Sequence, residues 1–361
     1  MIEASYWQER AEHLCQRLLD HYGEQGRDLP WRTNLHPYRV WLAEVMLQQT
    51  GVATVIPYYE KFLHHFPSVE SLAAADIAQV LTLWQGLGYY RRAHNLHRAA
   101  RMIQEVGIFP QDEAGWRSLP GVGANTAAAI MAIVHGTPTA ILDGNVKRVL
   151  ARLTALASPV KENESLLWQL AGWLTCRQQP GDYAQAIMDL GATLCLPRKP
   201  LCGQCPWSDE CLALASGNAQ QFPVAATKTV KPRLQQQAIL IWKEGEGLLL
   251  VQRPEQGLLA GLWQPPCGEM HRELPSLDTL VASLAMEITL EGEMPTVSHT
   301  FTHFHLTVHP HLARWQSGVP TLPAPWCWCN DPATLPMATL HRKILAGHPS
   351  LVRLVKATKK R

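Results

Sequence analysis

The sequence predicts a multidomain protein in which an all-α domain, residues 1–213, precedes a mixed α/β (α+β) domain, residues 237–361. In the first part apolar residues recur at spacings of three and four between short turns containing Gly or Pro, as in packed helices. In the second part the period changes to that of strands. A chain of 361 residues is long enough to bury two separate cores.

The stretch between the two domains, residues 214–236, is predicted to be a linker. Its residues are mostly small, polar or basic, and it contains Pro223 and Pro232. Three basic side chains in it are candidates for phosphate contacts: Lys228, Lys231 and Arg233.

The second domain begins with a predicted β-hairpin formed by residues 238–242 and 248–252. A further strand is expected within 296–309. Helices are expected near 277–288 and 337–345.

Four cysteines form the most specific motif, with the spacing C-x6-C-x2-C-x5-C: Cys195, Cys202, Cys205 and Cys211. Disulfides within this loop would be short and strained, so the thiols are interpreted as metal ligands. Only Cys202 and Cys205 form the C-x2-C pair that zinc knuckles use, and the longer arms favour an iron–sulfur cluster over zinc. A thiol ligand set also predicts a reducing compartment.

A second motif, LPGVG at 119–123, predicts a helix-hairpin-helix near 117–136. Gly121 and Gly123 would leave backbone N–H groups bare at a helix N-terminus, where they can bind a phosphate. From these residues alone, an ordinary helix–turn–helix corner is equally well supported. A sequence-independent contact of this kind would explain DNA binding by a chain whose net charge is only +2.

These motifs together resemble a known superfamily. LPGVGANTAAAI, then ILDGNVKRVLARL, then the four cysteines resemble the endonuclease III superfamily of DNA glycosylases. Within it, RDLPWR and PYRVWLAEVMLQQTGVATVIPYY closely resemble the adenine DNA glycosylases, the MutY family. The resemblance implies a helix-hairpin-helix glycosylase domain with a [4Fe-4S] cluster. It also implies removal of adenine opposite 8-oxoguanine or G in double-stranded DNA.

Two carboxylates can carry glycosidase chemistry. Glu44 lies in the apolar stretch VWLAEVML, so burial should raise its pKa and keep it protonated near neutrality; an exposed or Arg-paired Glu is the alternative. Asp143 precedes a helical run, where an N-capping carboxylate stays ionised. The resemblance assigns protonation of adenine N7 to Glu44. It assigns stabilisation of the sugar cation to Asp143 and a hydrogen bond in the sugar region to Asn145.

Asn125 bears on the type of glycosylase. Glycosylases that also cleave the strand place a nucleophilic Lys two residues after the second glycine of the hairpin. Asn cannot form the imine, so a monofunctional enzyme that leaves an abasic site is expected.

The resemblance also implies which residues contact DNA. Gln48-Gln49-Thr50 would enter the duplex, with Gln49 as the wedge that replaces the flipped base. Leu47 and Thr50 would contact the opposite base, beside which Tyr89 would stack. Gly51 departs from the family, where a longer side chain is usual, so a contact there is not predicted.

Other residues are expected at the adenine pocket or on phosphates. Trp31 and Arg32 would line the pocket, and Asp189 would lie near the flipped base. In the loop between the first two cluster cysteines, Arg198 and Lys199 would bind phosphate.

The C-terminal domain resembles a Nudix fold at residues 248–254 and 257–266. It lacks the R-E-x-x-E-E run that holds magnesium, so pyrophosphate hydrolysis is not expected. In the family this domain reads 8-oxoguanine, and the Phe-Ser-His loop of the family appears here as Phe301, Thr302 and His303. Five histidines crowd this region, where solvated or phosphate-binding roles are favoured over a metal site: His299, His303, His305, His309 and His311.

Two alternatives remain: a glycosylase/lyase of the endonuclease III kind, and an inactive iron–sulfur DNA-binding protein. Asn125 and the Nudix-like tail oppose the first. Glu44 opposes the second, because a carboxyl group in an apolar helix costs stability and would not be kept without a function. The N-terminus has no signal-peptide pattern and no apolar stretch approaches the ~20 residues of a membrane span. A monomeric, cytoplasmic, nucleoid-associated protein of the bacterial type is therefore expected.

Overall fold

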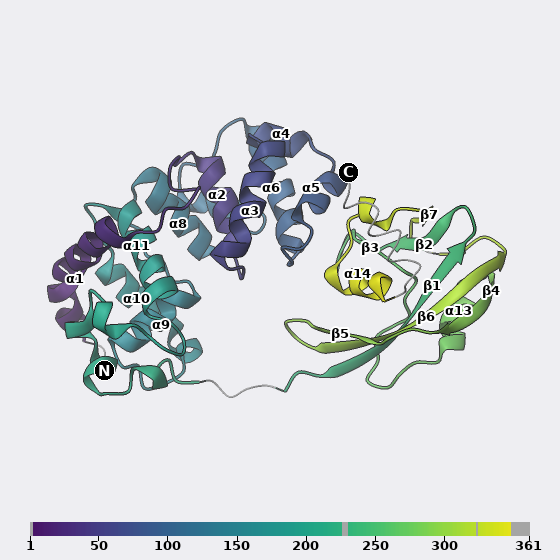
Figure 1. The fold of residues 1–361 in the computed structure, drawn as a ribbon. Helices are drawn as coiled ribbons and strands as arrows, with labels where there is room; N and C mark the ends of the chain where they lie inside the picture. Colours follow the sequence, from purple (N-terminus) through teal and green to yellow (C-terminus); the bar gives the residue numbers. More distant parts are fainter. Residues whose placement is uncertain (1–2, 226–229, 323, 348–361) are drawn as a thin grey trace. The chain divides into compact units, whose positions relative to one another are not determined.

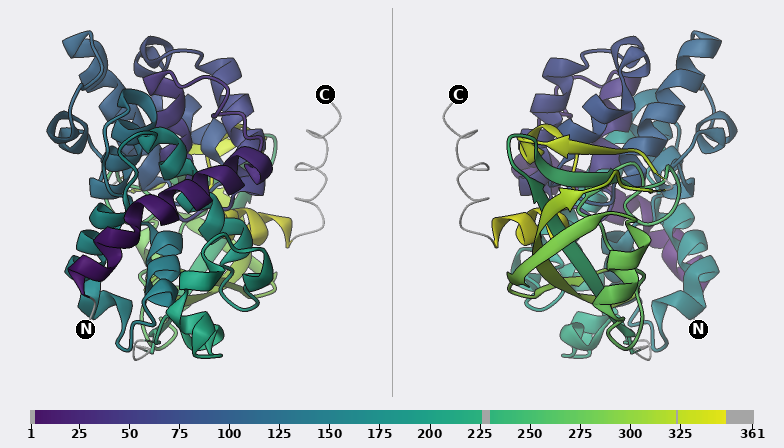
Figure 2. Two further views of the ribbon diagram at one scale, coloured as in Figure 1. Left: turned by 90° about the vertical axis from the view of Figure 1, so that its left-hand side faces the viewer. Right: turned by 90° about the vertical axis from the view of Figure 1, so that its right-hand side faces the viewer.

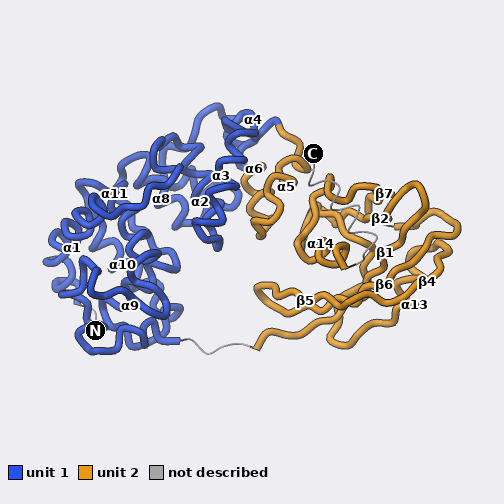
Figure 3. Tube along the Cα trace, viewed as in Figure 1, with its two compact units in different colours: residues 1–74, 98–228 blue, residues 75–97, 229–361 orange. Residues whose placement is uncertain are grey.

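The computed structural model describes residues 3–225, 230–322 and 324–347. The chain divides into two compact units (Figure 3). Unit 1 comprises residues 1–74 and 98–228, and unit 2 comprises residues 75–97 and 229–361. The grouping of the helical segment 75–97 with the C-terminal part was not predicted from the sequence.

Unit 1 is helical (Figure 1). Helix α6 (Arg91–Val106) begins in unit 2 and continues into unit 1. The other helices of unit 1 are α1 (Ala4–Gln25), α2 (Pro37–Leu47), α3 (Val52–His65), α4 (Val69–Ala74), α7 (Glu113–Ser118), α8 (Ala124–His135), α9 (Gly144–Leu153), α10 (Glu164–Leu174), α11 (Pro180–Asp189) and α12 (Leu212–Ala215).

Helix α8 lies at the centre of this unit, packed against α2, α7 and α11. Its sequence, ANTAAAIMAIVH, is rich in Ala, and residues 126–133 are buried. Small side chains let neighbouring helices approach closely, while β-branched and Met side chains fill the gaps. Gly136 ends the helix with a φ of 63°, the left-handed conformation that Gly adopts without steric cost.

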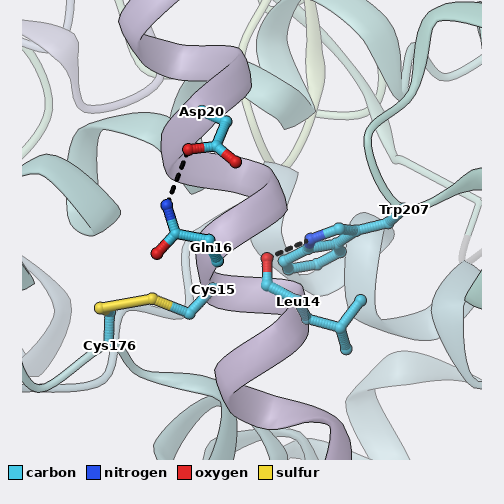
Figure 4. Close-up of a disulfide and its surroundings, with 6 residues drawn as sticks. All are labelled: Leu14, Cys15, Gln16, Asp20, Cys176 and Trp207. Carbon is cyan, nitrogen blue, oxygen red and sulfur yellow. Dashed lines mark hydrogen bonds between the residues drawn. A yellow bond between two sulfur atoms is a disulfide. The ribbon is translucent and has the colours of Figure 1, made fainter.

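Two adjacent residues of helix α1, Leu14 and Cys15, bond to later parts of unit 1 (Figure 4). Cys15 forms a disulfide with Cys176, which follows α10 and is 161 residues away in sequence. The indole Nε1 of Trp207 donates a hydrogen bond to the backbone oxygen of Leu14 at 2.9 Å. The disulfide was not predicted, since the cysteine motif had indicated a reducing compartment.

Unit 2 contains a mixed sheet in which seven strands are described, with the main order β3-β2-β1-β6-β4. Strands β1 and β6 are parallel, and the other pairings are antiparallel. β5 pairs with β6, and β7 pairs with β2. The strands are β1 (Arg233–Lys243), β2 (Gly247–Gln252), β3 (Trp263–Gln264), β4 (Glu287–Glu293), β5 (Val297–Thr300), β6 (His305–Ser317) and β7 (Trp326–Cys329).

The two faces of this sheet are buried by different helices. Ala238 and Leu240 of β1 share a core with residues of α14 (Thr339–Ala346). Ile239 and Ile241, which point to the opposite face, share a core with residues of α13 (Leu277–Ser283). Figure 2 shows the sheet and these helices from a second side.

Helix α5 (Ile77–Trp84) and the start of α6 belong to the same unit through hydrogen bonds with the C-terminal segment. The Oε1 of Gln85 accepts from the backbone N–H of Met337 at 3.3 Å. A ring nitrogen of His94 lies 3.0 Å from the backbone oxygen of Ala260. These contacts connect residues 75–97 to the later part of unit 2.

Several sequence predictions for the second domain need correction. Strand β1 begins at Arg233, so the last four residues of the predicted linker lie in the sheet. The predicted helix 277–288 ends at Ser283, and β4 follows from Glu287. The predicted strand within 296–309 is two strands, β5 and β6, joined by a tight loop. Lys228 lies outside the described residues. Within the described ranges, no helix has the length and apolarity to cross a membrane.

Candidate active site

Glu44 lies in the middle of α2, a helix whose Trp41, Leu42 and Val45 side chains are buried. Burial of the carboxyl group raises the pKa of Glu44 to about 7, because the protein interior disfavours the charged form. The charge of Asp143 raises this pKa further, while the nearby Arg32 guanidinium opposes the rise. The structure therefore brings Glu44 within electrostatic range of Asp143, which lies about a hundred residues later in the sequence.

Asp143 is the N-cap residue of α9, as its position before the helix indicated. Its Oδ1 accepts a hydrogen bond from the backbone N–H of Val146 at 2.7 Å. Its Oδ2 lies 3.4 Å from the Nδ2 of Asn145. One turn of α9 therefore fixes the orientation of this carboxylate.

Asn145 contacts two charged side chains beside it in the sequence. Its Oδ1 accepts from the Nη2 of Arg148 at 2.8 Å, while its Nδ2 faces Asp143. The Nε of Arg148 donates to the backbone oxygen of Cys195 at 2.7 Å. The Asn145 amide thus lies between Asp143 and Arg148 and orients the carboxylate.

Asp189 forms ion pairs with two arginines. Arg32 binds both of its oxygens at 2.8 Å, in the two-pronged geometry that suits a guanidinium and a carboxylate. Arg27 donates to it from its Nε at 2.9 Å and from its backbone N–H at 3.2 Å. Burial opposes ionisation of Asp189, but the hydrogen bonds and charges of Arg32 and Arg27 outweigh it and lower the pKa. Asp189 therefore holds Arg32 beside Glu44.

Trp31 is buried and meets Tyr59 of α3 edge to face, with ring centroids 5.3 Å apart. The guanidinium of Arg32 lies over the ring of Tyr22, 5.4 Å from its centroid. Trp31 and Arg32 are thus each held by an aromatic neighbour, and Arg32 lies within electrostatic range of Glu44.

The segment after Glu44 separates into anchored and exposed residues. The Nε2 of Gln48 donates to the Oγ1 of Thr126 at 3.1 Å and to the backbone oxygen of Gly121 at 3.3 Å. Gln49 is exposed and has a φ of 58°, a left-handed conformation that is unfavourable for a residue other than Gly. Leu47 and Thr50 are partly buried. The predicted wedge residue is thus presented to solvent on a strained turn.

The LPGVG turn joins α7 to α8, as predicted for the helix-hairpin-helix. Gly121 has a φ of 79°, which explains a Gly there, and Gly123 is the N-cap of α8. Both glycines are exposed, so the N–H groups that begin α8 lie near the surface. Asn125 is engaged elsewhere: its Oδ1 accepts from the backbone N–H of Leu142 at 2.7 Å.

The four motif cysteines line one cavity. Its remaining lining is mostly apolar and includes Leu194, Pro200 and Trp207, together with Arg152 of α9. Arg198 and Lys199 lie exposed on the loop between the first two cysteines, as phosphate-binding residues would have to.

The environment of Arg152 indicates that this cavity suits an iron–sulfur cluster. Its side chain is only 2% exposed, yet its acceptors are the backbone oxygens of Leu196, Pro197 and Phe222 and, at 3.3 Å, the Sγ of Cys195. A buried cation is costly unless an anion offsets it. Four thiolates around an iron–sulfur cluster supply that negative charge, and an apolar lining suits the cluster. When bound, the cluster supplies metal–thiolate bonds that join the loop 195–211 into one rigid unit.

In unit 2 the predicted reading loop connects β5 to β6. The backbone N–H of Phe301 donates to the oxygen of Phe304 at 2.8 Å, and the two rings stack with centroids 4.7 Å apart. Lys231, from the predicted linker, donates from its Nζ to the backbone oxygen of Phe301 at 3.2 Å. Thr302 and His303 are exposed at the tip of this loop. The loop is therefore closed at its base and presents two polar side chains.

Tyr89 belongs to the same unit. Its ring is 47% exposed, and its φ of 50° is again left-handed. The guanidinium of Arg92 lies 5.4 Å from the ring centroid. Like Gln49, Tyr89 is an exposed residue on strained backbone, which is typical of binding sites.

Three of the five histidines of this region lie within hydrogen-bond distance of side chains in the same unit. His309 and His311 lie 2.8 Å and 3.0 Å from the side-chain oxygens of Gln235 and Gln237, respectively. The Nδ1 of His305 lies 2.9 Å from the Oγ1 of Thr300. Among the residues that the structure describes, these histidines do not form a group of three with other His, Cys, Asp or Glu side chains that could hold a metal ion.

Comparison with known proteins identifies the parts of the chain. Residues 42–171 match the HhH-GPD superfamily of base excision DNA repair proteins, 195–211 match the iron–sulfur binding domain of endonuclease III, and 237–347 match the NUDIX domain. Adenine DNA glycosylase from Homo sapiens is 35% identical over 398 residues, covering 91% of this chain and 72% of the human protein. The chain belongs to the adenine DNA glycosylases.

Other relatives agree. The adenine DNA glycosylase of Buchnera aphidicola (subspecies Acyrthosiphon pisum, strain APS) is 35% identical, covering 83% of this chain and 86% of its own. Among solved structures, a thermostable thymine-DNA glycosylase is 27% identical, with a TM-score of 0.54, over 59% of this chain and 100% of its own. A trapped endonuclease III–DNA covalent intermediate shares the fold at 18% identity, with a TM-score of 0.50, over 60% of this chain and 99% of its own. The predicted family, fold class and [4Fe-4S] cofactor are therefore confirmed.

For this adenine DNA glycosylase, sequence reasoning missed three arginines near the site: Arg27, Arg148 and Arg152. A signal was available for two of them. In VKRVLARL, Arg148 and Arg152 are spaced i, i+4 and adjoin the buried Val149 and Leu153. On a helix whose other side chains are mostly apolar, such cations can become buried, and they then need anionic or carbonyl partners.

The pKa of Glu44 predicts how activity depends on pH. Only the protonated carboxyl can donate a proton, so the rate of base release should fall as pH rises above about 7, by roughly tenfold per pH unit. The single-turnover rate constant between pH 6 and 9 measures this. A rate that stays constant over that range would rule out Glu44 as a proton donor with the pKa given above.

Proposed function

We propose that this protein hydrolyses the N-glycosidic bond of adenine mispaired with 8-oxoguanine or G in double-stranded DNA and leaves an abasic site. The observation that carries the proposal is the pairing of Glu44, whose pKa is raised to about 7, with the helix-capping carboxylate of Asp143. One protonated and one ionised carboxyl are what acid-assisted cleavage of a glycosidic bond requires.

The chemistry divides between these two groups. Glu44 donates its proton to N7 of adenine, which makes the base a better leaving group. The negative charge of Asp143 stabilises the cation that develops on the sugar, with a transient covalent adduct that water resolves. Asn145 and Val146 keep the Asp143 carboxylate oriented throughout, through the contacts given above. Arg32, held by Asp189, lines the adenine pocket with Trp31.

Other residues would hold the DNA. The N–H groups that follow Gly121 and Gly123 bind phosphate, as do Arg198 and Lys199. Gln49 enters the duplex and replaces the flipped adenine, and Tyr89 stacks beside the opposite base. Support for these roles comes from the exposure of Gln49 and Tyr89 on left-handed backbone. Leu47, Gln48 and Thr50 complete this DNA-reading segment.

The domains divide the work between them. Residues 1–213 form the glycosylase domain, residues 214–232 the link, and the Nudix-like remainder, which starts at Arg233, reads the oxidised base. The absence of a Lys at position 125 makes the enzyme monofunctional. The working location is the cytoplasmic nucleoid.

One assay tests the function. An end-labelled duplex with A opposite 8-oxoguanine is incubated with the protein, and strand breaks are compared before and after hot alkali. Breaks that appear only after alkali support a monofunctional glycosylase. Breaks without alkali would indicate a lyase, and no breaks under either condition would indicate a DNA-binding protein without glycosylase activity.

Replacing Thr302 with Ala tests the reading loop. Loss of the hydroxyl donor should reduce the preference for 8-oxoguanine over G by roughly five- to tenfold, the equivalent of one hydrogen bond of about 1–1.5 kcal/mol. The measurement is the ratio of single-turnover rate constants on A:8-oxoguanine and A:G duplexes. Thr302→Ser, which keeps the hydroxyl, is the matched control and should preserve the ratio. An equal loss on both duplexes would reject Thr302 as the discriminating residue.

A further inference from the structure

The first turn of α8 contacts the segments that carry both carboxylates. Its residues Asn125 and Thr126 are adjacent in sequence. The Oγ1 of Thr126 accepts from the Nε2 of Gln48, which follows the helix of Glu44. The Oδ1 of Asn125 accepts from the backbone N–H of Leu142, the residue directly before Asp143. Two consecutive side chains therefore connect α8 to segments that are far apart in the sequence.

The contacts of Asp143 within α9 do not replace this connection. Val146 and Asn145 orient the carboxylate relative to α9, but they leave the position of that helix start relative to α2 undetermined. The bond from Leu142 to Asn125 fixes the backbone one residue before Asp143. A second side-chain tie between this segment and α8 lies farther away, where the Oγ1 of Thr139 donates to the backbone oxygen of Ala128 at 2.8 Å.

Displacement of Asp143 would be costly for catalysis. The stabilisation of a developing cation decreases as the anion moves away, and a misplacement of about 1 Å can cost about 100-fold in rate. A side chain that fixes the backbone beside Asp143 therefore acts on the rate without contacting the substrate.

We propose that Asn125 is a positioning residue that, through its bond to Leu142, holds Asp143 at its working distance from Glu44. This inference rests on the proposed function, since it concerns the same two carboxylates. It also gives the position at which lyases carry their nucleophile a distinct role in this chain, because the Asn125 oxygen is already engaged by the Leu142 N–H.

Three variants test this role in the full-length, cluster-containing protein. Asn125→Leu removes the acceptor and keeps the branching and the number of side-chain heavy atoms, and Asn125→Asp keeps the acceptor. Thr139→Val removes the other tie of the same segment and is the control for general loosening. Single-turnover adenine release, dissociation constants for the duplex and backbone amide exchange at Leu142 are measured for each, well below the unfolding temperature.

Asn125→Leu should lower the single-turnover rate constant at least tenfold at unchanged duplex affinity, and the Leu142 amide should exchange faster. Because the Asp143 charge raises the pKa of Glu44 and Arg32 opposes it, the pH at which the rate begins to fall should also move down. Asn125→Asp should restore amide protection and a rate within about threefold of wild type, and Thr139→Val should stay close to wild type.

Three results would overturn the inference: an Asn125→Leu rate equal to wild type, equal losses in Asn125→Leu and Asn125→Asp, or an equal loss in Thr139→Val. Leu142 amide exchange that is unchanged in Asn125→Leu would also overturn it, and this readout needs no substrate. Failure of the proposed function is recognised separately, because the wild-type protein would then release no adenine.

Discussion

Replacing Glu44 with Gln is expected to reduce adenine release by about 1000-fold or more while the variant still binds the duplex. Gln has nearly the same shape but no proton to donate to the leaving base, and general acid catalysis contributes about 100- to 10,000-fold. Single-turnover base release and duplex binding, measured on the same A:8-oxoguanine substrate, separate chemistry from affinity.

The matched control is Glu60→Gln, the same substitution at an exposed position of α3, which should leave the rate close to wild type. Turnover by Glu44→Gln within about tenfold of wild type would remove Glu44 as the acid. Loss of duplex binding in this variant would instead show that the residue is needed for affinity.

The same substitution should stabilise the fold at alkaline pH. The folded-state pKa of Glu44, about 7, lies above the ordinary value of 4.5, so the folded state binds this proton more tightly than the unfolded state does. Stability is therefore lost as pH rises from about 4.5 through 7, by up to about 3 kcal/mol. Gln has no charge to bury. The unfolding temperature of Glu44→Gln should thus be higher than that of the wild type at pH 8. At pH 4.5 the two unfolding temperatures should differ little.

Replacing Asp143 with Asn is expected to reduce adenine release by about 100- to 1000-fold, the range seen when one group that stabilises transition-state charge is removed. Asn caps helices as well as Asp does, so α9 should keep its N-cap bond to Val146 and the unfolding temperature should change little. The expected result is a large loss of rate without a loss of fold. Both proteins are compared from pH 5 to pH 7, because removal of the Asp143 charge should lower the pKa of Glu44 and the rate below that pKa isolates the loss of cation stabilisation.

A matched control exists in the same unit. Asp112 caps α7 and accepts from the backbone N–H of Gly115 at 2.7 Å, the same distance as in the Asp143 cap. Asp112→Asn should leave adenine release unchanged. If both variants lost activity equally, or if Asp143→Asn remained fully active, the charge of Asp143 would have no special part in the reaction.

The candidate site residues could be named from the sequence because their signals are local. A carboxyl in the apolar run VWLAEVML, an Asp before a helix, and four cysteines within one loop can be recognised from neighbouring residues. Helix periods and the turn at LPGVG depend likewise on nearby residues, so the helical character of the first part and the first β-hairpin were correct.

The errors have a physical cause as well. Strand β4 is exposed along almost its whole length and contains only two apolar residues, Ile288 and Leu290, too few to mark where the preceding helix ends and a strand begins. The hydrogen bond between Gln85 and Met337 likewise joins residues that are far apart in the chain, which no local pattern indicates. A helical period does not show which neighbour a helix will pack against.

By itself, the sequence determined the family, and it predicted the four cysteines as cluster ligands and Glu44 and Asp143 as the catalytic carboxylates, because each of these rests on residue types at short spacings. Only the tertiary structure decided how these parts are held. It paired Asp189 with Arg27 and Arg32, placed Asn125 on the backbone before Asp143, and buried Arg152 against Cys195. Such contacts join residues that are distant in the chain, and the packing of helices, rather than any local pattern, brings them together.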